Sequence, residues 1–382
     1  MLSTTISKLR CPSFISEGEI CQGEVALLGK GGAPQAFSGA AQEIASGTLF
    51  CQNCQTRYPI LAGVAVLTSD VASYILHHVK GISQLVSEDE IPVEYREDFI
   101  DAKSEIEAEH IEEDLEAERV VSLYLMNHYL RVGDGSQGTP AWLKPEQGGT
   151  VSPLIESLIR EHWDRGPFSQ ISQWFNSVAS EKPKASVIEL GSGVGGIYPL
   201  LKAKIGSYLG IDSSFASVAL ARHLALGAPY GRKVRVPGDL LQGPVSREVD
   251  IPIENALNGS ADFIVGEIES FPVQIGQADV TIALNAIDMM PEPALLPELQ
   301  YKLLKKGGIA IQSCPYIWHE QVARDLRERI PATIRDSAQA VEWLYTQAGF
   351  TMSQKVEHLP WLFFKHLRQL EIYSVHIFMA RA

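Results

Sequence analysis

Basic clusters, long apolar runs and a regular set of cysteines are all missing from this sequence of 382 residues. Its 32 lysines and arginines form no basic stripe, so a nucleic acid is not expected as a partner. No apolar run approaches the roughly 20 residues of a membrane span, and the first ten residues lack the apolar stretch of a signal peptide, so no membrane partner is expected. The five cysteines are too sparse and uneven for a disulfide scaffold, which favours a cytoplasmic location.

Negative charge is concentrated in one segment. The chain has a net charge of −14, and residues 88–118 contribute −13, because 15 Asp and Glu stand there against Arg96 and Lys103. The rest of the chain is therefore close to neutral. Apolar residues at helical spacing continue through the acidic segment, and a stretch rich in Gly, Pro and Gln follows at 134–150. Residues 71–150 are predicted to form a helical linker that ends in a loop.

Two other regions flank this linker. Residues 1–70 are rich in Gly and Cys and alternate over short stretches, which predicts a small β domain. Residues 151–382 alternate short apolar runs with helical stretches, which predicts an α/β fold with a Rossmann-like, doubly wound sheet. Its seven strands are expected at 186–190, 207–211, 262–265, 278–284, 308–313, 351–359 and 373–380. The closing antiparallel pair resembles the sheet of class I methyltransferases.

A glycine-rich turn follows the first of these strands, with the sequence ELGSGVGG at 189–196. Glycine lets the chain turn tightly and lets a ligand approach the backbone, and the amides of a helix N-terminus follow. Asp212 ends the next strand, where a carboxylate can accept hydrogen bonds from two ribose hydroxyls. Gly191, Gly193 and Gly196 also satisfy the dinucleotide pattern G-x-G-x-x-G, and a turn without a ligand is the simplest alternative.

Two further acids favour S-adenosylmethionine as the cofactor. Glu189 gives the motif the E-x-G-x-G form that resembles methyltransferases, where the acid organises the methionine end. Residues 266–272, GEIESFP, resemble the same enzymes. The resemblance implies that Glu267 accepts a hydrogen bond from the adenine amine and that Ile268 packs on the adenine ring. Alternatively, Glu267 is a solvated turn residue. The expected cofactor-binding residues are Glu189, Gly191, Ser192, Gly193, Asp212, Ser213, Glu267, Ile268 and Asn285.

The loops after the fourth and fifth strands are expected to flank the transferable methyl group, because ligands of open α/β sheets lie beyond the carboxyl ends of the strands. Methyl transfer needs an aligned nucleophile with a free lone pair. Asp288 is therefore predicted to accept an N–H of a nitrogen nucleophile, with Asn285 orienting it. Tyr316 is the third predicted catalytic residue and, with Trp318, would wall an aromatic or cationic substrate. Alternatively, Asp288 caps a helix that begins near Pro291, and Trp318 belongs to the core.

Several stretches resemble the C-terminal methyltransferase domain of ovothiol-biosynthesis enzymes. They are ALNAIDMMPEP at 283–293, SCPYIW at 313–318, LPWLFFKHLR at 359–368 and YLMNHY at 124–129. The resemblance covers about residues 118–382. It implies N-methylation of an imidazole-like group, and a helix over the site that presents Tyr124 and His128 to the substrate. The sequence departs from this family in the long segment 232–261 and in Cys314, and no sulfoxide-synthase module precedes the domain.

The N-terminal region resembles a Trm112-type zinc ribbon. The matching stretches are LRCP at 9–12, GTLFCQNC at 47–54, YPI at 58–60 and GVAVL at 63–67. That family binds one structural zinc with two C-x-x-C knuckles, and here Phe14 stands where the first knuckle would have its second cysteine. The implied ligands are Cys11, Cys21, Cys51 and Cys54, with Cys21 as the replacement. A ribbon that has lost its metal and folds on apolar contacts is the alternative.

The sequence thus predicts an S-adenosylmethionine-dependent methyltransferase with a zinc-ribbon domain and an acidic helical linker, residues 71–150, that is expected to form a lid over the active site. Its expected substrate is a small amino-acid-derived or imidazole-containing natural product, methylated on nitrogen. One alternative is an O-methyltransferase or peptide-modifying methyltransferase of secondary metabolism, whose acidic helix attracts a cationic substrate. Another is a non-catalytic partner that activates a separate methyltransferase. A homodimer is compatible with the sequence.

Overall fold

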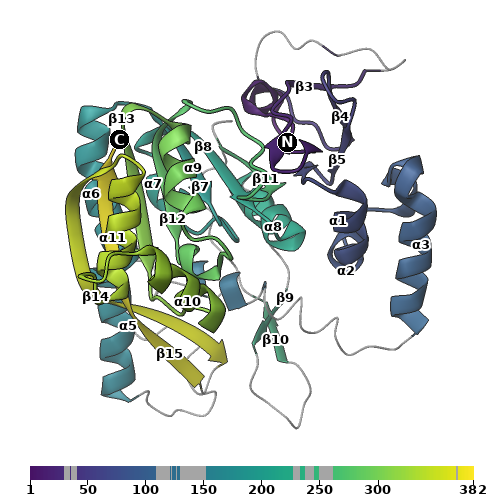
Figure 1. Ribbon diagram of the computed structural model, residues 1–382. Helices are drawn as coiled ribbons and strands as arrows, with labels where there is room; N and C mark the ends of the chain where they lie inside the picture. The colour runs from purple at the N-terminus through teal and green to yellow at the C-terminus, as the bar shows by residue number, and fades with distance from the viewer. Residues whose placement is uncertain are drawn as a thin grey trace.

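Figure 1 shows the computed structural model of the chain. The structure describes residues 1–29, 35, 41–108, 121, 123–125, 127–129, 152–226, 233–236, 245–248, 261–366 and 369–382. Within these residues, no helix combines the length and the apolar character that crossing a membrane requires. The predicted loop at 134–150 and the acidic residues 109–118 lie outside this part of the chain.

An eleven-stranded sheet organises the described residues, in the order β14-β15-β13-β12-β7-β8-β11-β6-β5-β4-β3. Its strands are β3 (Val25–Leu27), β4 (Gly47–Cys51), β5 (Arg57–Leu61), β6 (Val64–Leu67), β7 (Ala185–Leu190), β8 (Ile205–Asp212), β11 (Ala261–Gly266), β12 (Ala278–Leu284), β13 (Leu304–Cys314), β14 (Thr351–His366) and β15 (Gln369–Arg381). All seven stretches predicted as strands between residues 151 and 382 are strands. β7, β8, β11, β12 and β13 are parallel, whereas β15 runs antiparallel between β13 and β14.

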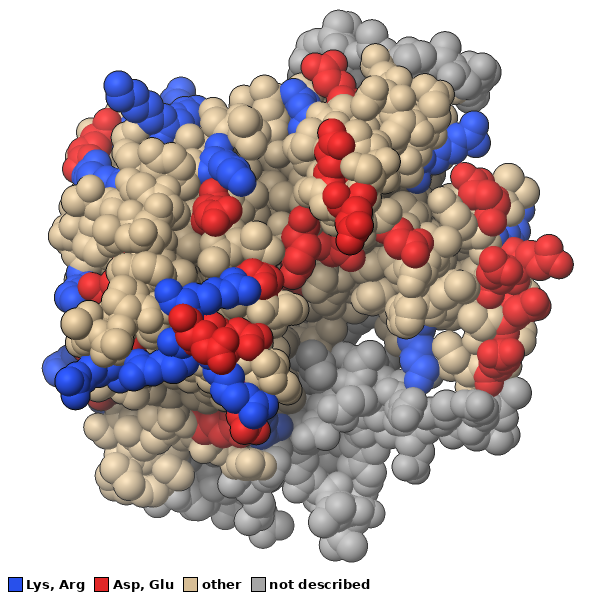
Figure 2. Space-filling model, in the orientation of Figure 1, with Lys and Arg blue, Asp and Glu red and all other residues tan. Residues whose placement is uncertain are grey.

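Helices cover this sheet on both faces. They are α1 (Val71–His77), α2 (Val79–Ser83), α3 (Val93–Ala108), α5 (Pro153–Arg165), α6 (Pro167–Glu181), α7 (Tyr198–Leu201), α8 (Phe215–Ala225), α9 (Leu295–Leu303), α10 (Glu320–Arg329) and α11 (Ser337–Gln347), with 3-10 turns η1 (Ser3–Lys8), η2 (Glu88–Glu90) and η5 (Ile287–Met289). Figure 1 shows α9, α10 and α11 on the near face and α6 behind the sheet. Asp and Glu gather along α3 at the right-hand edge of Figure 2.

The N-terminal strands belong to the same sheet as the Rossmann-like strands. β6 pairs in parallel with β11, with Val66 opposite Val265 and Leu67 opposite Gly266. β5, β4 and β3 continue the sheet as antiparallel neighbours. One apolar core joins both parts, because side chains from residues 1–70 and from β11 pack in a single buried cluster. The expected seven-stranded sheet is therefore extended to eleven strands, which covers the backbone edge that β11 would otherwise expose.

Some elements differ from the sequence prediction for identifiable reasons. α10 was not predicted, because only Leu326 of its residues is buried and most of the helix consists of charged residues. The helix that follows the glycine turn is the single turn α7. A hairpin of β9 (Lys233–Val236) and β10 (Val245–Glu248) interrupts the segment 232–261. The fifth strand begins earlier than the predicted 308–313, because β13 starts at Leu304, and its pairing with β12 is irregular at this start.

Candidate functional site

The glycine turn after β7 leaves its backbone open to a ligand. The amides of Gly191 and Ser192 donate to the carbonyl oxygen of Ile211, at 2.9 and 3.0 Å, and so fix the turn against the end of β8. Gly191 and Gly193 have φ of +70° and +50°, a region that side chains disfavour. A Cβ at Gly193 would meet nothing within 4 Å. The turn therefore needs glycine for its conformation, and open space lies in front of it.

Asp212 joins this turn to the start of α8. Its Oδ2 accepts from the amide of Gly193 at 2.8 Å, and its Oδ1 accepts from the amide of Ser214 at 2.9 Å. Burial raises the pKa of Asp212, and the two amide hydrogen bonds oppose that rise. Ser213 is exposed beside it. The carboxylate is thus held in one orientation, and a carboxylate offers further lone pairs for ribose hydroxyls.

Glu189 is a buried acid within the same motif. Its side chain is 3% exposed, and the hydroxyl of Tyr208 donates to its Oε2. Burial raises the pKa of Glu189 to about 8, with a further contribution from the charge of Asp212 and against the effect of the Tyr208 hydrogen bond. This acid therefore holds a proton at neutral pH until a positive charge approaches it.

Glu267 lies at the neighbouring strand end, because Val265 of β11 is paired with Asp212 of β8. Its Oε2 accepts from the Ser270 hydroxyl at 2.8 Å, from the Ser69 hydroxyl at 3.0 Å and from the Ser69 amide at 3.3 Å. Ile268 is half-buried against the core. Ser69 belongs to the segment between β6 and α1 and was not predicted as a site residue. No sequence signal marks it, because the contact spans 198 residues.

Asn285 and Asp288 connect the loops after β12 and β13. Asn285 has φ of +52°, and its Oδ1 accepts from the hydroxyl of Ser313 at 3.0 Å. Asp288 is 5% exposed, and its Oδ2 accepts from the amide of Ile317 at 2.7 Å. The helix-cap alternative for Asp288 is wrong, since α9 begins at Leu295 without a side-chain cap. The carboxylate instead fixes the second loop relative to the first.

Tyr316 and Trp318 form a stacked pair in the loop after β13, with ring centroids 5.9 Å apart. The Tyr316 hydroxyl is hydrogen-bonded to Nδ1 of His376 at 2.6 Å, and burial raises the pKa of Tyr316 above its usual range. The indole N–H of Trp318 donates to Ser337 at the start of α11 at 3.0 Å. His376 was not predicted, because one histidine among the apolar residues of β15 gives no signal of its partner.

The described helical residues 121, 123–125 and 127–129 lie against the glycine turn. A Cβ at Gly196 would come within 2.5 Å of the His128 ring, and the Tyr129 hydroxyl donates to the carbonyl oxygen of Val194 at 2.8 Å. Burial lowers the pKa of His128 to about 4, so the ring is neutral at pH 7. Tyr124 is 40% exposed, with its ring 5.9 Å from that of His128. Tyr124 and His128, two of the three predicted substrate residues, therefore lie on an element that adjoins the turn.

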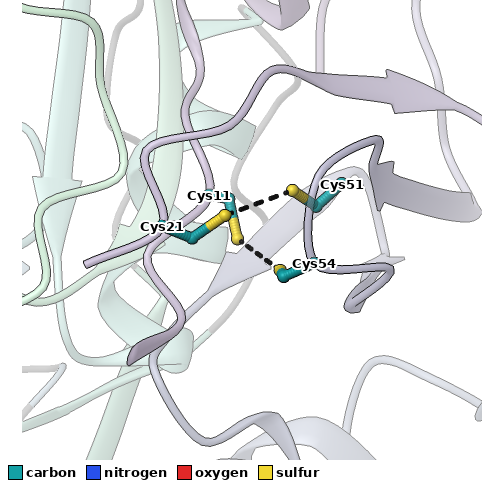
Figure 3. A group of neighbouring side chains, drawn as sticks. All are labelled: Cys11, Cys21, Cys51 and Cys54. Carbon is teal, nitrogen blue, oxygen red and sulfur yellow. Dashed lines mark hydrogen bonds between the residues drawn. The ribbon is translucent and has the colours of Figure 1, made fainter. Parts of the chain in front are cut away.

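The four N-terminal cysteines meet at one point, which Figure 3 shows. Their Sγ atoms all lie within 4.8 Å of one another, with Cys11 and Cys54 at 3.3 Å and Cys21 and Cys51 at 3.7 Å. None of them forms a disulfide. A zinc ion with four sulfurs at about 2.3 Å has sulfur pairs about 3.8 Å apart, so this thiol set fits a tetrahedral site. Cys21 therefore lies beside the other three cysteines, where the implied replacement ligand was expected.

Comparisons with known proteins show only distant similarity. No protein-family model and no curated protein matches the sequence. Magnesium protoporphyrin IX methyltransferase from Synechocystis PCC 6803, with bound SAH, is 16% identical over 70% of this chain and 94% of its own, with a TM-score of 0.39. A complex of the Haloferax volcanii Trm112 methyltransferase activator and a methyltransferase gives 17% identity over 57% of this chain and 98% of that chain, with a TM-score of 0.34. The [4+2]-cyclase SpnF is 14% identical over 69% of this chain and 96% of its own, with a TM-score of 0.38. Similarities of this size assign neither a family nor an activity.

Proposed function

We propose that this chain is an S-adenosylmethionine-dependent methyltransferase that acts on a small nitrogen nucleophile. The observation that carries the proposal is the convergence of an open glycine turn and two oriented acids at three adjacent strand ends. Asp212 is hydrogen-bonded to the turn at Gly193, and Glu267 follows the strand residue paired with Asp212. Bound S-adenosylmethionine supplies a methyl group activated by the adjacent sulfonium.

The strand order distinguishes this proposal from dinucleotide binding. Numbered in chain order, the seven strands of the C-terminal region run 3-2-1-4-5-7-6, and the seventh is antiparallel. A dinucleotide-binding sheet has the order 3-2-1-4-5-6. The inserted antiparallel strand resembles class I methyltransferases and supports S-adenosylmethionine as the cofactor of this glycine turn.

Each part of such a cofactor has a matching group in the site. Glu189 would face the methionine end, Asp212 the ribose hydroxyls, and Glu267 and Ile268 the adenine. The open backbone at Gly193 leaves room for the ligand. Ser192 has a buried hydroxyl without a hydrogen-bond partner among the described residues, so the turn also carries an unused polar group.

The two loops beyond β12 and β13 supply the candidate catalytic groups. Asp288 already accepts the Ile317 amide and retains lone pairs to accept an N–H of the nucleophile, which directs the free lone pair of an imidazole or amine away from the carboxylate. Asn285 is fixed by Ser313 and would orient the acceptor. The stacked rings of Tyr316 and Trp318 suit a flat or cationic substrate.

A methyl-transfer screen tests the proposal. Purified protein is incubated with S-adenosylmethionine and histidine, thiohistidines or related imidazoles, and products are read by mass. We expect at least one imidazole to gain one methyl group, with S-adenosylhomocysteine formed in equal amount. If the protein binds neither S-adenosylmethionine nor S-adenosylhomocysteine by isothermal titration, the proposal fails and a non-catalytic partner role becomes the better reading.

Asp288→Asn separates turnover from cofactor binding. The amide no longer provides a charged acceptor, so we expect turnover on the best substrate of the screen to fall roughly 100-fold. Affinity for S-adenosylhomocysteine should stay within about threefold, because Asn still accepts the Ile317 amide. Asp101→Asn, an exposed residue of α3, is the matched control and should change neither quantity. Unchanged turnover in Asp288→Asn would remove this residue from catalysis.

Cofactor binding should depend on pH through Glu189. Its pKa of about 8 means that the free protein holds the proton at pH 6–7, whereas the positively charged end of the cofactor favours the carboxylate. Binding therefore releases a proton, and affinity should rise with pH by up to about tenfold per unit until pH approaches this pKa. Titrations with S-adenosylmethionine between pH 6 and 7.5 measure the slope. Glu189→Gln cannot titrate and should flatten it; an equal slope in this variant would assign the proton elsewhere.

A further inference from the structure

A segment outside the predicted cofactor motifs contacts both turns that are expected to bind the cofactor. The amide and hydroxyl of Ser69 donate to Glu267, as described above. The hydroxyl of Tyr74, in α1, donates to the carbonyl oxygen of Ser213 at 2.6 Å. The Tyr74 side chain is 7% exposed, and burial raises its pKa above its usual range, with smaller contributions from the charges of Asp212 and Glu267. Residues 69–74 thus touch the ribose side and the adenine side of the candidate site.

The sheet explains why these residues arrive there. β6 and β11 are parallel and end together, with Leu67 opposite Gly266, so the chain that leaves β6 runs beside the turn that leaves β11. Asp70 then caps α1 by accepting from the amide of Ser73 at 3.0 Å. The helix starts at once, and its first turn carries Tyr74 to the end of β8. The ring of Tyr74 stacks on that of His78, with centroids 3.9 Å apart, which limits its movement.

The far end of the Glu267 turn is held by the same N-terminal domain. The amide of Arg10 donates to the carbonyl oxygen of Pro272 at 2.8 Å. The side-chain amide of Gln22 donates to the carbonyl oxygen of Phe271 at 3.0 Å. Arg10 and Gln22 each adjoin a cysteine of the four-cysteine cluster in the sequence. Residues 267–274 are therefore fixed on both sides by residues 1–70 rather than by the Rossmann-like strands alone.

We propose that Ser69 and Tyr74 are positioning residues of the cofactor site, so that the N-terminal domain and linker set the affinity for the cofactor. This inference rests on the proposed function. Ser69 and Ser270 place three donors on one oxygen of Glu267, which fixes the direction in which the carboxylate faces an adenine amine. Tyr74 fixes the turn that follows Asp212. Groups that are ordered before binding lose less conformational entropy when the ligand arrives.

Isothermal titration of the full-length chain with S-adenosylhomocysteine tests this inference. Ser69→Ala and Tyr74→Phe should each bind roughly three- to tenfold more weakly, the size expected when one hydrogen bond to a site group is lost. Ser73→Ala removes an exposed hydroxyl from the same helix and should stay within about twofold. Ser69→Thr keeps both donors and should restore the affinity. Thermal melting of every variant reports whether the fold is intact.

A second ligand separates positioning from a general structural effect. S-inosylhomocysteine replaces the adenine amine with a carbonyl oxygen, so the exocyclic atom that is proposed to donate to Glu267 becomes an acceptor. Ser69→Ala should then bind this ligand as well as the unaltered chain does, whereas Tyr74→Phe should weaken both ligands. Equal loss for both ligands in Ser69→Ala, or no loss in a folded Ser69→Ala, overturns the inference. Failure of the unaltered chain to bind S-adenosylhomocysteine is a different result, which overturns the proposed function and with it this inference.

Discussion

Asp212→Ala is expected to abolish binding of S-adenosylhomocysteine. The carboxylate is the proposed acceptor for the ribose hydroxyls, and it also holds the amides of Gly193 and Ser214, so its removal takes away ligand contacts and loosens both turns. Loss of two hydrogen bonds to a charged group corresponds to at least about a 100-fold loss of affinity. Isothermal titration measures this loss of affinity. Asp212→Asn keeps one acceptor oxygen, so its affinity should lie between those of the unaltered chain and Asp212→Ala.

Asp279→Ala is the matched control for that variant. Asp279 is also a carboxylate that joins two strands, since its Oδ2 accepts from the amide of Ser186 at 2.9 Å and from Lys305 at 2.9 Å. It lies at the start of β12, at the opposite end of the sheet from the glycine turn. Its removal should lower thermal stability and leave the affinity for S-adenosylhomocysteine unchanged. If Asp212→Ala behaves like Asp279→Ala, the cofactor site lies elsewhere.

Removal of metal from the four-cysteine cluster is expected to have the second large effect. Metal analysis should find about one zinc per chain, because four thiolates at these distances match a closed structural site. Stripping it with a chelator, or replacing Cys51 with Ser, should lower the Tm by about 10 °C or more, since structural zinc contributes several kcal/mol of folding free energy. Chelation and the Cys51 replacement should both lower the Tm, because Cys11 and Cys51 are buried inside the N-terminal core.

Cys314→Ala provides the comparison for the metal experiment. Cys314 is buried in β13, away from the cluster, and its replacement should leave the zinc content unchanged. A protein that is metal-free as purified, and whose melting is indifferent to chelator, would contradict the zinc site. Its N-terminal domain would then be held by apolar contacts, as the alternative interpretation of the cysteine pattern states.

Local patterns were sufficient to predict the elements that carry the site. Apolar periodicity located the strands, and the glycines and acids at their ends located the turns, because each of these signals is written within a few residues. The group formed by Cys21 with the other three cysteines was also predicted, from the resemblance to a ribbon with one displaced ligand. Asp288 was expected near a second loop, and the structure shows it bonded to that loop through Ile317.

Contacts between distant parts of the chain were not predictable in the same way. Ser69, Tyr74 and His376 have hydrogen-bond partners 198, 139 and 60 residues away. A single serine, tyrosine or histidine gives no sequence signal of so distant a partner. The addition of β6 to β11 was missed for the same reason, since an apolar edge strand can accept many neighbours. The hydrophobic pattern predicts that an edge must be covered and leaves open which segment covers it.

Parallel pairing of β6 with β11 also bears on how the chain is made. The paired residues Val66 and Val265 are separated by about 200 residues, so the N-terminal strands leave the ribosome long before their neighbour exists. During that interval one side of β6 lacks its partner, and closing so long a loop is slow. A four-cysteine site within residues 11–54 that forms early would keep this domain folded until the remaining strands of the sheet are synthesised.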